Sequence, residues 1–202
     1  MAHIVLISGS HRKGSQTGRV ADYLAARLGV LAGATTDVIK LEGNPLPLWD
    51  ERAWEPESDL TRIFAPYAAQ LRTADGLVVL TPEWAGMTSA AIKNFMLYTH
   101  ESMVGHKPAL LVSVSTGSGG SYPINEMRTS SYKNNKIAYL PEHLIIRNVA
   151  EVFKGDQPAS KDDEYIRGRA DFALNILLRY ARALAPVRQE GDLFDTRYPY
   201  GM

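Results

Sequence analysis

The chain has 202 residues, which is enough for one substantial α/β domain and leaves little room for a second independent core. Its 22 basic and 22 acidic residues balance, so the charge gives no electrostatic case for a nucleic-acid or membrane partner. Cysteine is absent, which excludes disulfides, thiol nucleophiles and cysteine-ligated metals. No apolar run approaches the roughly 18 residues of a membrane span, and the start of the chain lacks a signal-peptide pattern, so we expect a cytoplasmic protein.

Short apolar runs alternate with segments of helical periodicity. The runs lack clean polar alternation, as is typical of parallel strands that are covered on both faces. The predicted strands are 4–7, 38–41, 76–80, 109–114 and 144–146, and the predicted helices are 20–31, 60–71, 89–98, 124–138 and 163–184. This alternation predicts a three-layer α/β sandwich with a five-stranded parallel sheet.

We expect residues 1–187 to form a single domain. The remaining residues, 188–202, form an aromatic and charged tail. Two readings of this tail stay open: it frays, or it docks on a neighbouring subunit.

The segment after the first predicted strand is the most informative part of the chain. There IVLI gives way to SGSHRKGSQT, a small-residue turn with hydroxyls and an arginine just before a helix. Because a helix N-terminus has unsatisfied N–H groups and a partial positive charge, this arrangement predicts a phosphate site. The P-loop lysine is missing after Gly14, and no G-x-G-x-x-G is present, so a single terminal phosphate fits better than a nucleoside triphosphate or a dinucleotide. The alternative is a polar turn with capping serines.

Two further loops follow the third and fourth predicted strands, at 81–88 and 115–122. In open α/β sheets ligands bind outside the carboxyl ends of the strands, so we expect both loops to share an edge with the phosphate loop. Trp84 lies in the first of them, where it could pack on a conjugated ring or on a subunit neighbour. Gly117, Gly119 and Gly120 would let the backbone of the second loop approach a flat ligand closely, although a flexible loop without a ligand would show the same glycines.

With these loops in view, the chain resembles the NADPH-dependent FMN reductase family, flavodoxin-like flavoproteins that include chromate, azo-dye and quinone reductases. The resemblance covers roughly residues 3–150. The family's loop G-S-x-R-x-x-S is matched by Gly9, Ser10, Arg12 and Ser15. Its second motif, T-P-E-Y-N-x-S-x-P-G-x-L-K-N, is kept at Thr81, Pro82, Glu83, Lys93 and Asn94, and is altered at Trp84, Ala85, Met87, Ser89 and Ala90.

The resemblance implies a strand order of 2-1-3-4-5 and an FMN-dependent oxidoreductase. In this family a hydride passes from NADPH or NADH to the flavin, and the electrons pass on to a small acceptor: a quinone, an azo dye, a metal oxyanion or free flavin. The FMN phosphate would be held by Ser10, Arg12, Ser15, Gln16 and Thr17, and the flavin ring would lie along Pro82, Glu83, Trp84, Ala85 and Gly86 and along Ser115, Gly117 and Gly119. No catalytic side chain is required, and the scattered histidines lack metal-ligand spacing, so we expect neither a catalytic residue nor a metal.

Two other functions stay open. The altered second motif also suits a non-enzymatic FMN-binding module or redox-linked regulator, and the first loop alone suits a hydrolase or transferase of a phosphorylated small molecule. The family often forms homodimers or homotetramers, and we expect the same here. The apolar loop at 45–54 is a candidate subunit contact, because exposed apolar loops usually mark interfaces.

Overall fold

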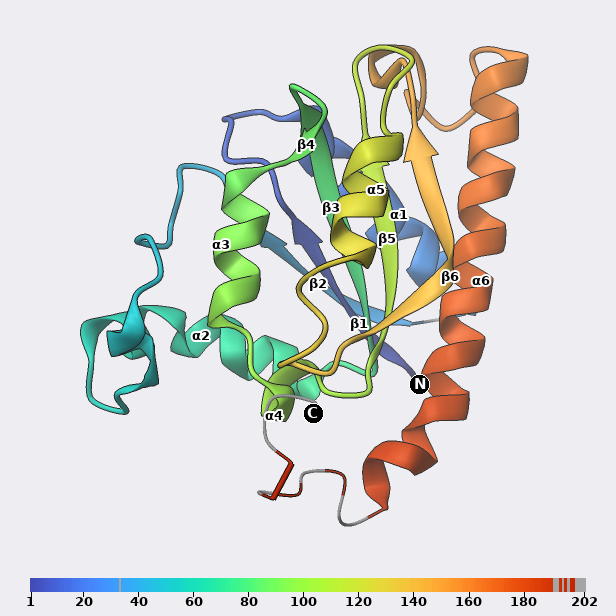
Figure 1. The fold of residues 1–202 in the computed structure, drawn as a ribbon. Helices are drawn as coiled ribbons and strands as arrows, with labels where there is room; N and C mark the ends of the chain where they lie inside the picture. Colours follow the sequence, from blue (N-terminus) through green and yellow to red (C-terminus); the bar gives the residue numbers. More distant parts are fainter. Residues whose placement is uncertain (33, 191–192, 194, 196, 199–202) are drawn as a thin grey trace.

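The sheet in the computed structural model consists of five parallel strands and one short antiparallel strand (Figure 1). The structure describes residues 1–32, 34–190, 193, 195 and 197–198. The parallel strands are β1 (His3–Ser8), β2 (Thr35–Lys40), β3 (Gly76–Trp84), β5 (Pro108–Val114) and β6 (Ala138–Ile146). Their order, β2-β1-β3-β5-β6, confirms the expected 2-1-3-4-5 arrangement of the parallel strands.

Helices cover both faces of this sheet, and two apolar layers fill the space between (Figure 1). One face packs on α1 (Gln16–Ala32) and α6 (Lys161–Gln189), and the other on α2 (Asp59–Thr73), α3 (Ala90–Tyr98) and α5 (Ser121–Arg128). Side chains alternate between the faces along each strand, so that Ile4 and Leu6 join the first layer and Val5 and Ile7 the second. This explains the unbroken apolar runs of the central strands β1, β3 and β5, in which nearly every residue is buried.

The shorter elements are α4 (Glu101–Val104), η1 (Glu51–Trp54) and η2 (Val149–Glu151). No helix among the described residues has the length and apolar content that crossing a membrane requires.

The strands expected at 38–41 and 144–146 begin earlier, at Thr35 and Ala138, and two other expected segments differ more strongly from the structure. The helix expected at 124–138 is wrong in its bounds: α5 runs from Ser121 to Arg128, and the chain then turns through a polar segment into β6. Buried Asn135 holds that segment, since its amide donates to Thr99 Oγ1 (2.8 Å) and accepts from Ile137 N (3.1 Å). The loop expected at 81–88 is instead a β-hairpin, in which β3 continues to Trp84 and pairs with β4 (Met87–Thr88).

The order of the strands reverses between β1 and β3. The connections leaving these two strands therefore go to opposite faces, and in open α/β sheets this is the place where ligands bind. The phosphate-type loop follows β1 and the hairpin ends β3, while the glycine loop at 115–120 follows the neighbouring β5. The topology thus brings the three predicted loops to one edge, at the top of Figure 1.

Candidate functional site

The loop after β1 presents hydroxyl groups whose protons are free to donate. Ser10 Oγ accepts from Arg12 N (3.3 Å), and Ser15 Oγ accepts from Gly18 N (3.0 Å), so Ser15 caps α1. A hydroxyl that accepts still has a proton to give. Ser10 and Thr17 are 2% exposed, whereas the guanidinium of Arg12 is exposed and makes no hydrogen bond to a described side chain.

Close backbone packing fixes this loop against the sheet. Gly9 N donates to Leu80 O (2.8 Å), and a Cβ on Gly9 would lie only 2.7 Å from that oxygen. No larger residue fits there, which explains the glycine in physical terms. Ser89, the N-cap of α3, donates to Gly9 O and accepts from Ile92 N, and it thereby joins the loop to the helix after the hairpin.

The hairpin turn is formed by Ala85 and Gly86, both in the left-handed region with φ of 49° and 73°. Two such residues make the type of turn that matches the twist of paired strands. The preceding Trp84 is half-buried, and its ring meets the His11 ring edge-on, with centroids 4.7 Å apart. The phosphate-type loop and the hairpin therefore touch through an aromatic pair.

A carboxylate joins the hairpin to the glycine loop. Glu83 Oε2 accepts from Gly120 N (2.7 Å) and from the Ser115 hydroxyl (3.3 Å). A Cβ on Gly119 would lie 2.0 Å from the same oxygen, so the carboxylate occupies the space that a side chain at this position would need. Sequence reasoning left the Glu83 side chain without a definite role, and the structure shows that it ties two of the three loops together.

A second carboxylate ties the hairpin to α5. Glu126 accepts from Thr88 N (2.7 Å) and from Lys93 Nζ (3.1 Å). Burial alone would raise the pKa of Glu126, but the hydrogen bonds from Thr88 and Lys93 outweigh it and lower the pKa. The Glu126 carboxylate therefore stays charged at neutral pH.

Sequence reasoning missed Arg147, which supports the glycine loop from outside. Its Nε donates to Ser118 O (2.7 Å) and Gly119 O (3.0 Å), although the two residues lie 28 or more positions away. The signal that could have found it is its position directly after the fifth predicted strand, at the same edge as the loops.

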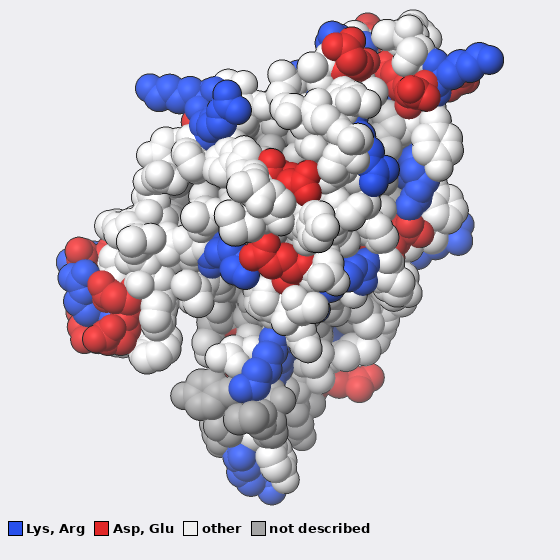
Figure 2. All heavy atoms as spheres, turned by 45° about the horizontal axis from the view of Figure 1, so that its top comes forward, with Lys and Arg blue, Asp and Glu red and all other residues white. Residues whose placement is uncertain are grey.

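These features test whether the edge suits FMN. The first loop offers two buried hydroxyls, a capped helix N-terminus and an exposed guanidinium, which is the donor set of a phosphate monoester. The hairpin and the glycine loop provide two backbone segments with little side-chain bulk, as a flat ring system needs. Figure 2, which brings this edge forward, shows a largely uncharged face with a few charges of both signs. The residues present fit FMN.

The structure places every predicted site residue at this edge. Ser10, Thr17, Pro82 and Ser115 are buried, Ser15, Glu83 and Trp84 are half-buried, and Arg12, Gln16, Ala85, Gly86, Gly117 and Gly119 are exposed. Gln16 is in part committed elsewhere, because its carbonyl oxygen accepts from Arg19 Nε (2.8 Å). Its amide group keeps its donors.

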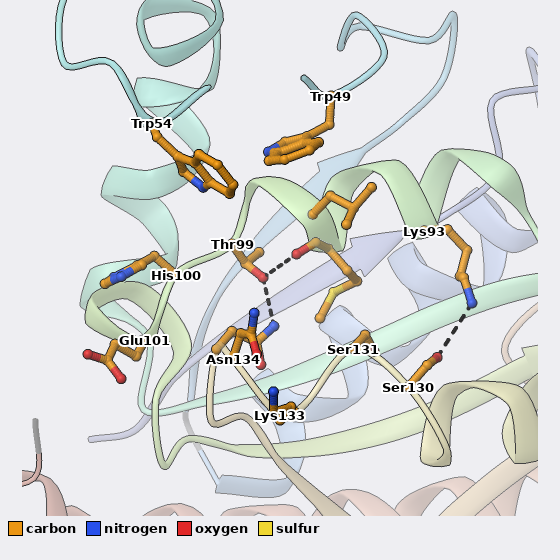
Figure 3. Close-up of a pocket in the computed structure, with 13 residues that line it drawn as sticks. Trp49, Trp54, Lys93, Thr99, His100, Glu101, Ser130, Ser131, Lys133 and Asn134 are labelled. Atoms are coloured by element: carbon orange, nitrogen blue, oxygen red, sulfur yellow. Dashed lines mark hydrogen bonds between the residues drawn. The ribbon is translucent and has the colours of Figure 1, made fainter. Parts of the chain in front are cut away.

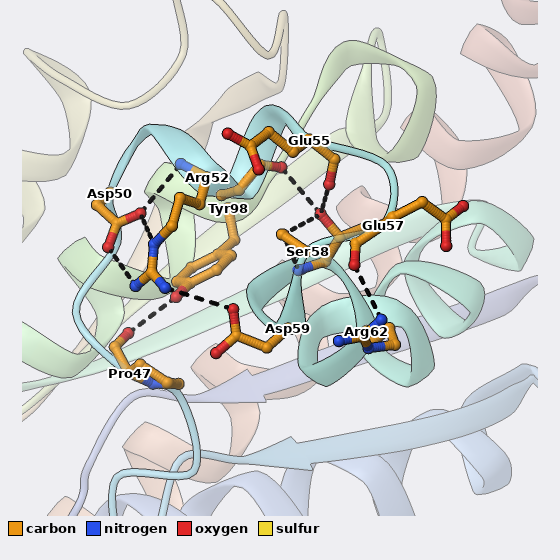
Figure 4. A network of polar contacts seen from close by, with 11 residues as sticks. Pro47, Asp50, Arg52, Glu55, Glu57, Ser58, Asp59, Arg62 and Tyr98 are labelled. Atoms are coloured by element: carbon orange, nitrogen blue, oxygen red, sulfur yellow. Dashed lines mark hydrogen bonds and ion pairs between the residues drawn. The ribbon is translucent and has the colours of Figure 1, made fainter.

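Beyond the edge, an arm formed by residues 42–58 projects from the body beside α3. Asn94 holds it, since its amide accepts from Trp49 N and donates to Pro47 O, both at 2.8 Å. Tyr98 also donates to Pro47 O (3.0 Å), and Arg52 pairs with Asp50 (2.8 Å) inside the arm (Figure 4). Asn94, the asparagine of the second motif, therefore holds the arm against α3 through two hydrogen bonds.

Under the arm lies a cavity of about 640 Å³. Trp49 and Trp54 form one wall, with their ring centroids 5.1 Å apart, and the end of α3 and the loop at 130–135 form the other (Figure 3). The expectation that the apolar residues of the loop at 45–54 lie at the surface is wrong for Leu46, which is buried, whereas Leu48 and Trp54 are 83% and 74% exposed.

Comparison with known proteins agrees with the geometry of the edge. A sequence model of the NADPH-dependent FMN reductase family matches residues 2–151. The chain belongs to this family. An NADPH azoreductase from Bacillus sp. (strain OY1-2) is 32% identical over 128 residues, which is 63% of this chain and 67% of the relative. An FMN-dependent NADPH-azoreductase from Staphylococcus haemolyticus (strain JCSC1435) is 25% identical over 162 residues, 80% of this chain and 78% of the relative.

Solved structures share the fold of this FMN reductase family member. A flavoenzyme NAD(P)H:(acceptor) oxidoreductase from Paracoccus denitrificans has a TM-score of 0.69 at 17% identity, covering 89% of this chain and 99% of the other. Membership of the family makes the chain an oxidoreductase that uses FMN and NAD(P)H.

Proposed function

We propose that this FMN reductase family member transfers a hydride from NADPH or NADH to bound FMN and passes the electrons to a small planar acceptor, a quinone or an azo compound, in a cytoplasmic setting. The observation that carries the proposal is the convergence of the phosphate-type loop, the hairpin and the glycine loop at one edge, where Glu83 ties the hairpin to the glycine loop. FMN, when bound, supplies the redox chemistry, and the protein supplies binding and orientation.

In this proposal the first loop fixes one end of the cofactor. Arg12 and the hydroxyls of Ser10, Ser15 and Thr17 donate to the phosphate, and the Gln16 amide adds a further donor. The α1 N-terminus contributes its unpaired N–H groups and its partial positive charge. This end is held by charge and hydrogen bonds.

The ring end is held differently, by backbone and by shape. The hairpin from Pro82 to Gly86 lies on one side and Ser115, Gly117 and Gly119 lie on the other. Glu83 sets the distance between the two segments. No side chain needs to donate or accept a proton for a hydride transfer, because the cofactors carry that step.

Apolar side chains beside the hairpin support a planar aromatic acceptor. Met87 and Tyr122 are 55% and 70% exposed, and a Cβ on Gly86 would lie 4.0 Å from the Tyr122 ring. Exposed apolar groups gathered in one place are typical of a surface that binds an apolar partner. A quinone or an azo compound presents such a face, whereas a metal oxyanion does not.

We also propose that the protein works as a homodimer or homotetramer. The exposed Leu48 and Trp54 on the arm support an interface, as does the cavity beneath them. Light scattering should give a multiple of the 22.3 kDa chain. Replacing both residues by serine should lower that mass, and a monomeric wild type would refute this part of the proposal.

The decisive experiment is an FMN titration followed by stopped-flow reduction. Purified protein should bind FMN, and NADPH or NADH should then bleach its visible absorbance, with return of the colour on addition of a benzoquinone. Protein that binds FMN but is reduced by neither nicotinamide would favour the non-enzymatic module. Turnover of phosphate esters without flavin would favour the hydrolase.

Arg12→Ala tests the phosphate end of the site. Loss of a charge-assisted hydrogen bond should weaken FMN binding by about 1.5–3 kcal/mol, or at least about tenfold in Kd. Lys13→Ala, at the exposed neighbouring position, removes the same charge and should change the affinity far less. Equal losses in both variants would mean that only the general positive charge matters.

A further inference from the structure

A second cavity, of about 300 Å³, lies at the opposite edge of the sheet, where the strands begin. Side chains from the end of α2, from the segment before β5 and from the last turn of α6 line it. Its charged residues are Arg72, Asp75, Glu101, Lys107 and Arg188. None of them belongs to the flavin edge, the sheet edge with the three loops that we propose to bind FMN.

Lys107 places a nearly buried ammonium beside this cavity. The residue is 7% exposed, and its Nζ donates to Leu71 O (2.6 Å) and Arg72 O (2.8 Å) at the end of α2. An ammonium has three N–H donors, so one remains after these two bonds. Burial, with a smaller repulsion from Arg188, lowers the pKa of Lys107 to about 8.

Arg188 adds a second cation whose hydrogen bonds are incomplete. Its side chain is 15% exposed, and its Nη1 is buried without a hydrogen-bond partner among the residues that the structure describes. Its Nη2 lies 3.6 Å from Asp75 Oδ1, and the other oxygen of that carboxylate accepts from His3 N (2.9 Å). The Asp75 carboxylate therefore contacts both Arg188 and His3 N, and it leaves N–H donors of the Arg188 guanidinium without an acceptor in the described part of the chain.

The charges around the cavity do not balance among the described residues. Glu101 pairs with Lys136 at 2.7 Å, which leaves Asp75 to face Lys107, Arg188 and the exposed Arg72. Buried cations are nearly always paired, because an uncompensated buried charge is unfavourable. An anion in the cavity would balance the excess positive charge. It would also accept hydrogen bonds from the remaining donors of Lys107 and Arg188.

We propose that this cavity binds a phosphate group between Lys107 and Arg188. The planar fork of a guanidinium matches the oxygens of phosphate, and the ammonium adds a point charge from a different element. The phosphate is either free or the end of a small ester, and the chemistry of recognition is the same for both. This site is separate from the flavin edge and does not depend on the proposed reaction.

The test is calorimetric titration at constant ionic strength with inorganic phosphate and, separately, glycerol 3-phosphate. Because phosphate can also enter the first loop, the titrations use FMN-saturated protein and, in parallel, the Arg12→Ala protein. We expect binding in both, and Arg188→Gln should weaken it at least about tenfold. Arg182→Gln removes the same charge from an exposed position of α6 outside the cavity and should leave the binding unchanged.

Binding of inorganic phosphate alone would assign a free oxyanion, and binding of the ester would assign a phosphorylated small molecule. Arg188→Lys keeps the charge without the fork, and an intermediate affinity would support the site even where the glutamine variant fails to fold. No binding of either probe, or equal weakening by Arg182→Gln, would overturn the proposal. Failure of FMN binding would refute the proposed function but leave Arg188-dependent phosphate binding intact.

Discussion

Ala85 adopts a left-handed backbone conformation, φ 49°, that is unfavourable for a residue with a Cβ. Ala85→Gly should therefore raise the free energy of unfolding by about 1 kcal/mol. Ala69→Gly, at an exposed position inside α2, should lower it by about the same amount. Urea denaturation measures both, and effects of the same sign in the two variants would contradict the explanation.

Glu83 is the residue on which the geometry between the hairpin and the glycine loop depends. Glu83→Ala leaves the Gly120 amide without its acceptor, which costs about 1–3 kcal/mol for a buried donor. The exchange of that amide with solvent, followed by NMR, should become about ten to one hundred times faster, and FMN binding should weaken with it. Glu83→Gln keeps an acceptor oxygen and should restore most of the protection. Unchanged exchange in the alanine variant would show that the bond does not hold the loop.

At the scale of elements, two serines each cap the N-terminus of a helix, but we expect only one of them to affect FMN binding. Ser15 caps α1 through Gly18 N (3.0 Å), and Ser58 caps α2 through Thr61 N (3.1 Å). Each alanine variant should lose about 1 kcal/mol of stability by denaturant titration. Only Ser15→Ala should also weaken FMN binding, because only α1 begins at the flavin edge. A matched loss of affinity in Ser58→Ala would point to general destabilisation instead.

The elements themselves were largely predictable, since residues 4–7 and 109–112 are apolar on both faces, as is typical of buried parallel strands. The hairpin was not, because a two-residue strand has no periodicity and the positive φ of Ala85 has no mark in the sequence. The end of α5 was missed because Asn135 is buried by contacts with Thr99, far away in the chain.

The predicted site residues came from local motifs, and their positions at one edge follow from the parallel topology. The side chains that connect the loops were harder to foresee. Glu83 meets Gly120 across 37 positions, and Arg147 meets Ser118 across 29. Such pairs depend on the register of neighbouring strands and on loop shape, which a single sequence does not encode locally.

For the whole molecule, Lys107 makes the free energy of unfolding change with pH in the alkaline range. Its pKa is lowered from 10.5 to about 8, so below about pH 8 the folded protein carries the full cost of a buried charge. Between about pH 8 and 10.5 the unfolded chain binds more protons than the folded one, and this contribution to stability rises, by about 3 kcal/mol in all.

The measurement compares wild type with Lys107→Met in phosphate-free buffer. The unfolding free energy of the wild type relative to the variant should increase between about pH 7 and about pH 10.5. Other groups that titrate in this range, such as the tyrosines, contribute equally to both proteins and cancel in the difference. Parallel pH curves would show that Lys107 titrates normally in the fold.

Because all five long strands are parallel, the proposed flavin edge lies at their carboxyl ends, and the start of the chain lies at the opposite end. β1 begins at His3, and α6 finishes at Gln189, both on the side opposite the flavin edge (Figure 1). A tether joined to the start of the chain would therefore leave the proposed flavin edge facing outward. On an electrode or a bead, such a protein would present its redox face to the bulk solution in every correctly attached copy.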